Sequence, residues 1–151
     1  MTERIYETPK SWLTLGVCAQ IFENFKRSLE FDEPIPPFET RFKGRLESIV
    51  ESVSQTFDGK QLNPTILDAA SAYFYQIISG HPFENGNKRV AVLYTHSFLL
   101  INGLDFDLSF NEIYNFAVVV AMSGKGKVEV KEVRDFCREV IEKFTKDLDS
   151  R

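Results

Sequence analysis

Two apolar helical segments, separated by one short polar loop, constrain the fold of this 151-residue chain most strongly. Apolar side chains cover most of the circumference of a helix expected from about residue 64 to residue 79. A second segment, from about residue 87 to residue 102, is also largely apolar. A helix that is apolar nearly all round must be enclosed by other elements. The sequence therefore predicts a packed pair of central helices, with the polar loop at their junction.

Caps and breakers predict the limits of these helices and of two that come before them. Ser11 is a suitable N-cap for a helix over about residues 12–31, and another helix is expected over about residues 44–57. Asn63, followed by a proline, is expected to cap the first central helix, and Gly80 to end it.

The C-terminal third predicts two more helices. Ser109 is expected to cap one that runs to about Met122, and a strongly amphipathic helix is expected over about residues 129–147. The prolines in residues 34–37 exclude a helix there, and residues 38–42 fit either a short strand or a loop over the core. The expected fold is an all-α helical bundle in a single domain, residues 1–151, with at most one short β-hairpin.

Composition narrows the functional classes. The formal net charge of -4 argues against a general nucleic-acid binder, so no direct nucleic-acid partner is expected. We find neither a bilayer-spanning apolar run nor the apolar stretch of a secretion signal, so we expect a cytoplasmic protein without a membrane partner. Cys18 and Cys137 lie far apart in helical patterns and are expected to be buried thiols.

The loop between the central helices, residues 81–89, carries the chemistry; it reads His-Pro-Phe-Glu-Asn-Gly-Asn-Lys-Arg. His81 is a candidate general base, because the ordinary pKa of histidine, ~6.5, is close to working pH. Gly86 allows backbone amides to approach a phosphate, Asn87 offers an amide, and Lys88 and Arg89 neutralise phosphate oxygens. Two cations in the first turn of a helix each cost about 0.3–1 kcal/mol unless an anion compensates. The loop therefore predicts a phosphate-binding site.

The same loop resembles the signature of the Fic/Doc family, the filamentation-induced-by-cyclic-AMP and death-on-curing proteins. That signature reads His-Pro-Phe-x-(Asp/Glu)-Gly-Asn-(Gly/Lys)-Arg, and the chain departs from it only at Asn85. The resemblance implies an all-α Fic-type fold and transfer of part of a nucleoside triphosphate, such as ATP, to a Ser, Thr or Tyr hydroxyl of a protein. It implies that His81 removes the hydroxyl proton and that Phe83 secures the loop.

The resemblance also implies roles for the residues that follow. Gly86, Asn87 and Arg89 would hold the phosphates, and a lysine at the position of Lys88 is similar to death-on-curing toxins, which phosphorylate a translation factor, elongation factor Tu. Glycine at that position is typical of AMP-transferring Fic enzymes, so AMP transfer is the alternative activity. The segment Glu39-Thr40-Arg41 is either a flap that aligns the target by strand addition or a loop over the core.

Asn85 stands where the family has its magnesium-binding acid. An amide is a weaker ligand for Mg²⁺ than a carboxylate, so a second alternative is a catalytically weak protein that binds a nucleotide or a partner. No Ser or Thr stands four residues before any glutamate, so the self-inhibiting Ser/Thr-x-x-x-Glu pattern of many Fic proteins is missing. We therefore expect an antitoxin protein, or some other mechanism, to restrain the activity.

Overall fold

The computed structural model describes residues 2–26, 35–126 and 128–148, and this part of the chain is mostly helical, as predicted. The helices are short 3-10 helices η1 and η3 and the α-helices α1 to α6: η1 (Arg4–Tyr6), α1 (Leu15–Phe25), η3 (Phe38–Thr40), α2 (Arg45–Ser54), α3 (Ile66–Gly80), α4 (Asn87–Ile101), α5 (Phe110–Ser123) and α6 (Val130–Phe144). Two short antiparallel strand pairs complete the fold: β1 (Thr56–Phe57) with β2 (Lys60–Gln61), and β3 (Leu104–Phe106) with β4 (Thr145–Asp147).

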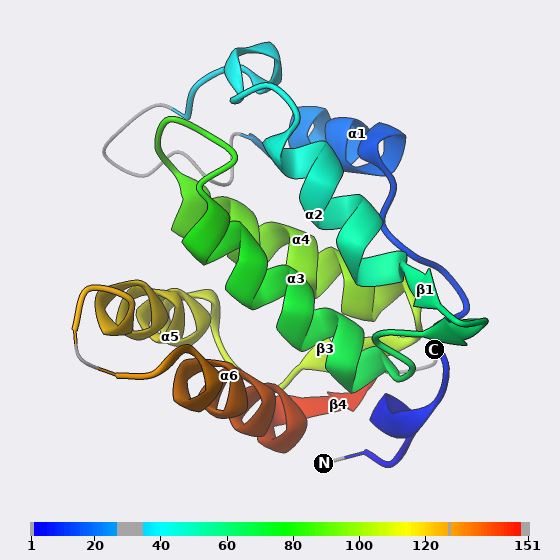
Figure 1. Ribbon diagram of the computed structural model, residues 1–151. Helices are drawn as coiled ribbons and strands as arrows, with labels where there is room; N and C mark the ends of the chain where they lie inside the picture. Colours follow the sequence, from blue (N-terminus) through cyan, green and yellow to red (C-terminus); the bar gives the residue numbers. More distant parts are fainter. Residues whose placement is uncertain (1, 27–34, 127, 149–151) are drawn as a thin grey trace.

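The predicted central pair is confirmed, because α3 and α4 form the middle of the molecule (Figure 1). α3 contacts α2, α4, α5 and α6, so it is enclosed on nearly every side. Tyr73 and Phe74 of α3 are fully buried, and Tyr94 and Phe98 of α4 are equally buried. The two apolar helices thus form the centre of one continuous core, to which the other helices add their own buried side chains.

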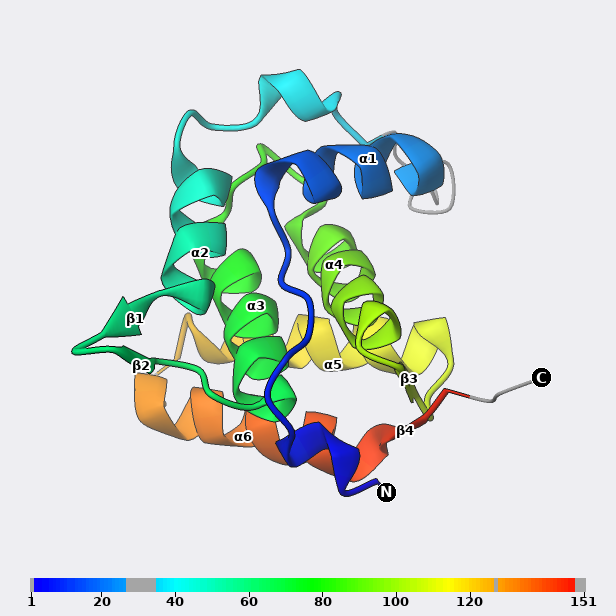
Figure 2. The ribbon, with the colours of Figure 1, turned by 90° about the vertical axis from the view of Figure 1, so that its right-hand side faces the viewer.

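The segment before α1 runs along the length of the central pair (Figure 2), and hydrogen bonds to buried side chains hold it there. The Tyr73 hydroxyl accepts the Leu13 backbone N–H at 3.1 Å. Asn102, which is 4% exposed, accepts the N–H groups of Lys10 and Ser11 at 2.8 and 3.2 Å and donates to the Ser11 carbonyl at 3.0 Å. These bonds give an irregular segment a defined path.

Both predicted N-caps in the first half of the chain are wrong. α1 begins at Leu15, and Thr14 caps it by accepting the Val17 N–H at 3.1 Å, because the backbone of Ser11 is bonded to Asn102. α3 is capped by Thr65. Asn63 instead donates to the Val53 carbonyl at 3.0 Å. The expected end of the first helix, residues 27–31, lies outside the described residues.

The segment after α2 forms a hairpin, although we predicted that the helix continues to residue 57. Asp58 and Gly59 have φ values of 52° and 77°, as the two-residue turn of a twisted β-hairpin requires. The hairpin therefore lies at residues 56–61 and not at residues 38–42. At the latter, the first three residues form η3, in which the Thr40 hydroxyl donates to the Pro37 carbonyl at 2.6 Å.

The last predicted helix is three residues too long. α6 ends at Phe144, and Thr145–Asp147 pairs with the strand that follows α4. Thr145 is 1% exposed, and its hydroxyl donates to the Ile141 carbonyl at 2.6 Å. A buried β-branched residue favours the extended strand at this point. The expected start of α5 is confirmed, since Ser109 forms a capping box with Glu112.

Cys18 and Cys137 are free and fully buried, as predicted. Burial raises the pKa of each thiol to about 12, so neither forms a reactive thiolate at neutral pH. Within the described residues, no helix combines the length and the apolar character that crossing a membrane requires.

Replacing Asn102 with alanine tests the role of the hydrogen bonds at the end of α4. The change leaves backbone donors and acceptors without partners, each at about 1–3 kcal/mol, so we expect Asn102→Ala to lower the free energy of unfolding by about 2–4 kcal/mol. Urea denaturation measures this difference. The control Asn115→Ala removes an exposed amide from α5 and should change stability by less than about 0.5 kcal/mol. Equal losses in the two variants would contradict the assigned role.

Candidate active site

The signature loop, residues 81–89, joins the C-terminus of α3 to the N-terminus of α4, and its first residue has a left-handed backbone. His81 occupies the C-cap position of α3 with φ 46° and ψ 62°, and it is exposed to solvent. The start of α2 and the segment before it bond to the first two carbonyls of the loop. Arg45 Nη1 donates to the His81 carbonyl at 3.1 Å, and the Phe42 N–H donates to the Pro82 carbonyl at 2.8 Å. These two hydrogen bonds therefore fix the backbone at His81.

Phe83 attaches the loop to the core. Its side chain is completely buried, and its ring stacks on that of Phe22 of α1, with centroids 5.5 Å apart and an interplanar angle of 8°. The Phe38 ring of η3 lies 6.0 Å away at a tilted angle. Three segments that are distant in sequence thus meet at one aromatic cluster. Moving the loop would require opening that cluster.

Asn87 links the loop to the first turn of α4. Its side-chain Oδ1 accepts the Phe83 N–H, and its Nδ2 donates to the Phe83 carbonyl, both at 2.9 Å. This pair of bonds determines which way the amide faces. Nδ2 also lies 3.4 Å from His81 Nδ1, and it can donate to this nitrogen in the neutral tautomer that carries its proton on Nε2. Asn87 therefore contacts the imidazole and favours that tautomer.

Gly86 brings backbone close to two neighbours. Its φ is 79°, and a Cβ at this position would lie 3.2 Å from Ile35 Cδ1 and 3.2 Å from Arg89 Nη2. Gly86 is the N-cap of α4 and supplies no side-chain cap, whereas Thr65 and Ser109 cap α3 and α5 with their hydroxyls. The first turn of α4 also contains no acidic residue. This helix N-terminus therefore keeps the positive end of its dipole uncompensated.

Two cations reinforce that positive end in different ways. Arg89 is 7% exposed, with its guanidinium against Gly86, so it helps to build the loop from within. Lys88 is half-buried and forms no ion pair with any carboxylate in the described part of the chain. Glu84 and Asn85 both stand exposed at the tip of the loop.

His81 and Lys88 line one cleft of about 290 Å³, which we call the motif cleft. Its other walls come from α3 and from the α5–α6 junction, and include the apolar side chains of Ile78, Val120, Val130 and Val133. Lys125, in the turn after α5, lines it as well. The cleft thus combines an imidazole, two lysines and an apolar wall. Such a wall suits a planar base, and the lysines suit phosphates.

The sequence leaves open whether Lys125 contacts a nucleotide or a partner, and the structure places it in the wall of the motif cleft. It lies in a glycine-containing turn whose sequence is typical of a solvated connection, and it is far from the signature loop along the chain. Only the packing of α5 and α6 against α3 brings this turn to the loop. No local sequence signal carries that information.

The segment Glu39-Thr40-Arg41 lies next to the loop but is not an extended flap. Arg41 is engaged, because its Nε lies 3.2 Å from Glu47 Oε1 and its guanidinium stacks 4.3 Å above the Phe38 ring. Glu39 and Thr40 are exposed. The 3-10 turn leaves no strand edge at these residues, so strand addition would require a change in their backbone conformation.

The chain offers few ligands for a metal. No group of three or more His, Cys, Asp and Glu side chains that could hold an ion occurs among the described residues. The amide oxygen of Asn85 is the candidate that the loop provides, so Mg²⁺ bound here would take most of its oxygen ligands from phosphates and water. The glycine cradle and the cations fit a phosphate group, and the exposed amide fits an ion that arrives with it.

The second histidine has a different environment. His96 of α4 lies with its Nε2 2.6 Å from Asp105 Oδ1, and its ring packs at 5.7 Å from that of Phe106. These contacts join α4 to β3. His96 therefore acts in packing and takes no part in the motif cleft.

A family model described as the Fic/DOC family matches residues 14–99, more than half of the chain. The chain belongs to the Fic/DOC family. Proteins of this family generally transfer a nucleotide or phosphate group to other proteins. The searches of curated proteins and of solved structures gave no match. The matched region contains the loop, α3 and all but the last two residues of α4, whereas Lys125 and the rest of the α5–α6 wall lie beyond it.

Substituting alanine for Gly86 tests the close approach at this residue. A non-glycine residue with φ near 80° costs about 1–2 kcal/mol, and the new Cβ would also press on Ile35 and Arg89. Gly59→Ala is the matched control, because Gly59 has φ 77° but no heavy atom within 4 Å of such a Cβ. We expect Gly86→Ala to lose at least about 1 kcal/mol more than Gly59→Ala in urea denaturation. Equal losses would show that the loop tolerates the extra atom.

Proposed function

We propose that this protein is a death-on-curing-like phosphotransferase that moves the γ-phosphoryl group of ATP, or of another nucleoside triphosphate, to a Ser, Thr or Tyr hydroxyl of a protein. The observation that carries the proposal is the motif cleft, where the candidate base His81 stands with Lys88, a cation that has no ion pair among the described residues, beside the uncapped N-terminus of α4. A base and a phosphate site must be adjacent for a hydroxyl to attack a bound phosphate.

In the proposed reaction, His81 takes the proton from the target hydroxyl. The hydroxyl oxygen forms a bond to the γ-phosphorus while the bond from that phosphorus to the β–γ bridging oxygen breaks, and the nucleoside diphosphate leaves. The basic lone pair of the imidazole is on Nδ1 in the tautomer that Asn87 favours. When Nδ1 accepts the proton, it gives up its long contact with Asn87 Nδ2. Asn87 therefore acts as the positioning residue for the base.

Charge neutralisation supports the same step. Lys88 and the N–H groups of the first turn of α4 would bind the transferred phosphate, and Arg89 with Gly86 would support the loop around it. Mg²⁺, when bound, would supply further neutralisation, with Asn85 as the contribution of the chain. Lys125 and the apolar wall would receive the rest of the nucleotide. The likeness of Lys88 to the lysine of death-on-curing toxins favours phosphoryl over AMP transfer.

Control by a second protein agrees with this assignment. The chain lacks the Ser/Thr-x-x-x-Glu pattern with which many Fic proteins inhibit themselves. A cytoplasmic toxin with no internal restraint requires a separate antitoxin, and a translation factor such as elongation factor Tu is the target class that the resemblance supports. An antitoxin-like neighbouring reading frame would support the pairing.

Labelled nucleotides test the reaction. The full chain is incubated with purified elongation factor Tu, Mg²⁺ and ATP that is labelled at either the γ or the α phosphate. We expect γ label on protein, and His81→Asn should lower its rate by about 10²–10⁴-fold because the general base is lost. His96→Asn, which removes the other histidine, should retain the rate.

Other outcomes decide against the proposal in distinct ways. Label from the α phosphate would identify an AMP-transferring enzyme. Absence of both labels, with nucleotide binding retained, would identify a binding protein, the alternative that Asn85 favours. Full activity in His81→Asn would exclude His81 as the base.

Asn85→Asp tests the contribution of the amide to metal binding. A carboxylate is a stronger ligand for Mg²⁺, so we expect the variant to reach half-maximal transfer at a Mg²⁺ concentration about tenfold lower. Transfer rates measured against Mg²⁺ concentration give this value, with Glu84→Gln as a control that alters the adjacent exposed residue. Unchanged rate and metal dependence in Asn85→Asp would exclude a metal role at this position.

A further inference from the structure

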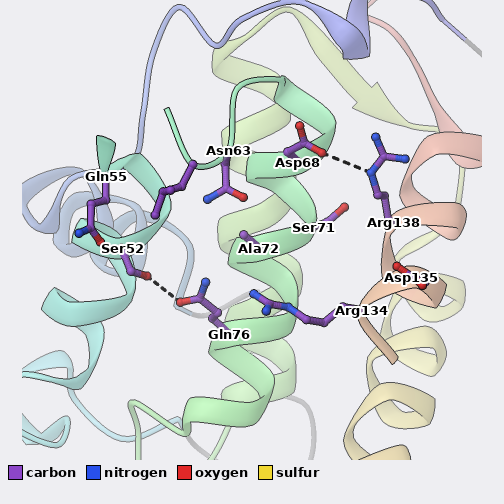
Figure 3. A pocket seen from close by; sticks show the side chains of 11 residues that line it. Ser52, Gln55, Asn63, Asp68, Ser71, Ala72, Gln76, Arg134, Asp135 and Arg138 are labelled. Carbon is purple, nitrogen blue, oxygen red and sulfur yellow. Dashed lines mark hydrogen bonds and ion pairs between the residues drawn. The ribbon is translucent and has the colours of Figure 1, made fainter. Parts of the chain in front are cut away.

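A polar cavity of about 440 Å³ lies between α2, α3 and α6, and none of the residues that line it also lines the motif cleft (Figure 3). Its volume falls within the range of roughly 300–1,000 Å³ that is usual for small-molecule sites. Its walls are mostly polar and include two carboxylates, two guanidinium groups and three amides. The chemistry of the cavity depends on which of these groups already have partners.

The two carboxylates are already neutralised. Asp68 Oδ2 accepts the Thr65 hydroxyl at 2.8 Å, and Asp68 Oδ1 lies 3.3 Å from Arg138 Nε. Asp135 pairs with Lys131 at 2.9 Å. Each acid of the cavity thus already has a cationic partner.

Three donors in the walls have no hydrogen-bond acceptor among the described residues. The Ser71 hydroxyl is buried, in a residue that is 9% exposed, and Figure 3 shows it directed toward α6. Gln76 uses its Oε1 to accept from Ser52 at 2.8 Å, so its amide N–H₂ group remains. Arg134 reaches across from α6 toward Gln76, stacks 5.2 Å from the Tyr75 ring and meets no described carboxylate within 4.0 Å.

The remaining charge in the cavity is therefore that of Arg134, accompanied by neutral donors. We propose that this cavity binds a small molecule that carries an oxyanion, either a carboxylate or a phosphate. Arg134 would hold the anion in its planar fork, and the Gln76 amide and the Ser71 hydroxyl would donate to its oxygens. Asn63 donates through its Nδ2 to Val53, so its Oδ1 remains to accept a hydroxyl of the same ligand. The proposal is independent of the reaction in the motif cleft.

The test is a titration of the full chain with two probes, succinate and inorganic phosphate, at constant ionic strength, followed by the backbone amide resonances. We expect saturable shifts centred on Ser71, Gln76 and Arg134 with at least one probe, and the tighter probe identifies the preferred oxyanion. Arg134→Gln should weaken binding by about tenfold or more, because it removes the charge and the fork. Ser71→Ala should weaken it by about threefold.

Two control variants distinguish binding in this cavity from binding at other cationic side chains. Lys143→Gln removes an exposed charge from the same helix, outside the cavity, and should bind the probe like the parent chain. Lys88→Gln should abolish only shifts around the motif loop. If circular dichroism shows that Arg134→Gln is unfolded, Arg134→Lys replaces it, because this variant keeps the charge and loses the fork. Arg134→Lys should bind the probe several-fold more weakly than the parent chain does.

Three results would overturn the proposal. The first is the absence of saturable shifts with both probes up to about 50 mM, because a dissociation constant above that concentration is too weak for specific binding of a small ligand. The second is equal affinity in the parent chain and in the folded Arg134 variant. The third is a set of shifts confined to residues 81–89, which would place oxyanion binding in the motif cleft alone.

Discussion

The pairing of the Asn87 side chain with the backbone of Phe83 is the interaction on which the candidate active site depends. It closes the loop between two buried helices by satisfying a buried N–H and a buried carbonyl at 2.9 Å each. Each of these groups would cost about 1–3 kcal/mol if it were left without a partner. The same amide reaches His81, so loop closure and orientation of the candidate base are one arrangement. A residue without both a donor and an acceptor cannot do this.

That arrangement also accounts for two local departures from ordinary structure. His81 has φ 46°, an unusual conformation for a non-glycine residue, and hydrogen bonds to its carbonyl and to the next one hold it. Lys88 and Arg89 place positive charge at the positive end of a helix dipole, where an acid would be stabilising. Both departures lie within nine residues, and among the described α-helices α4 alone has neither a side-chain cap nor an acid in its first turn. Such violations concentrate where a site must bind something.

The sequence was sufficient for features determined by local patterns. The apolar circumference of residues 66–80 and 87–101 identified the central pair, and Ser109 identified the start of α5. Local patterns failed where two residues offered the same cap chemistry, as with Ser11 and Thr14, because tertiary bonds to Asn102 decided between them.

Non-local pairing accounts for the other differences. β3 and β4 are about forty residues apart, so the sequence near Thr145 does not predict its strand partner, Phe106. Lys125 enters the motif cleft for the same reason, through packing of α5 and α6. The signature residues were found because they are contiguous, whereas the opposite wall of their cleft comes from a part of the chain with no motif.

α3 gives the molecule two separate polar surfaces, although most of its own residues are apolar. Its C-terminal end carries His81 into the motif cleft, and its middle presents Ser71 and Gln76 to the cavity between α2 and α6. Tyr75 stands between them, because its ring lines the motif cleft while Arg134 of the cavity stacks on it at 5.2 Å. An anion that draws Arg134 away from this ring would alter a wall of the cleft. The two sites therefore share a physical contact through one side chain.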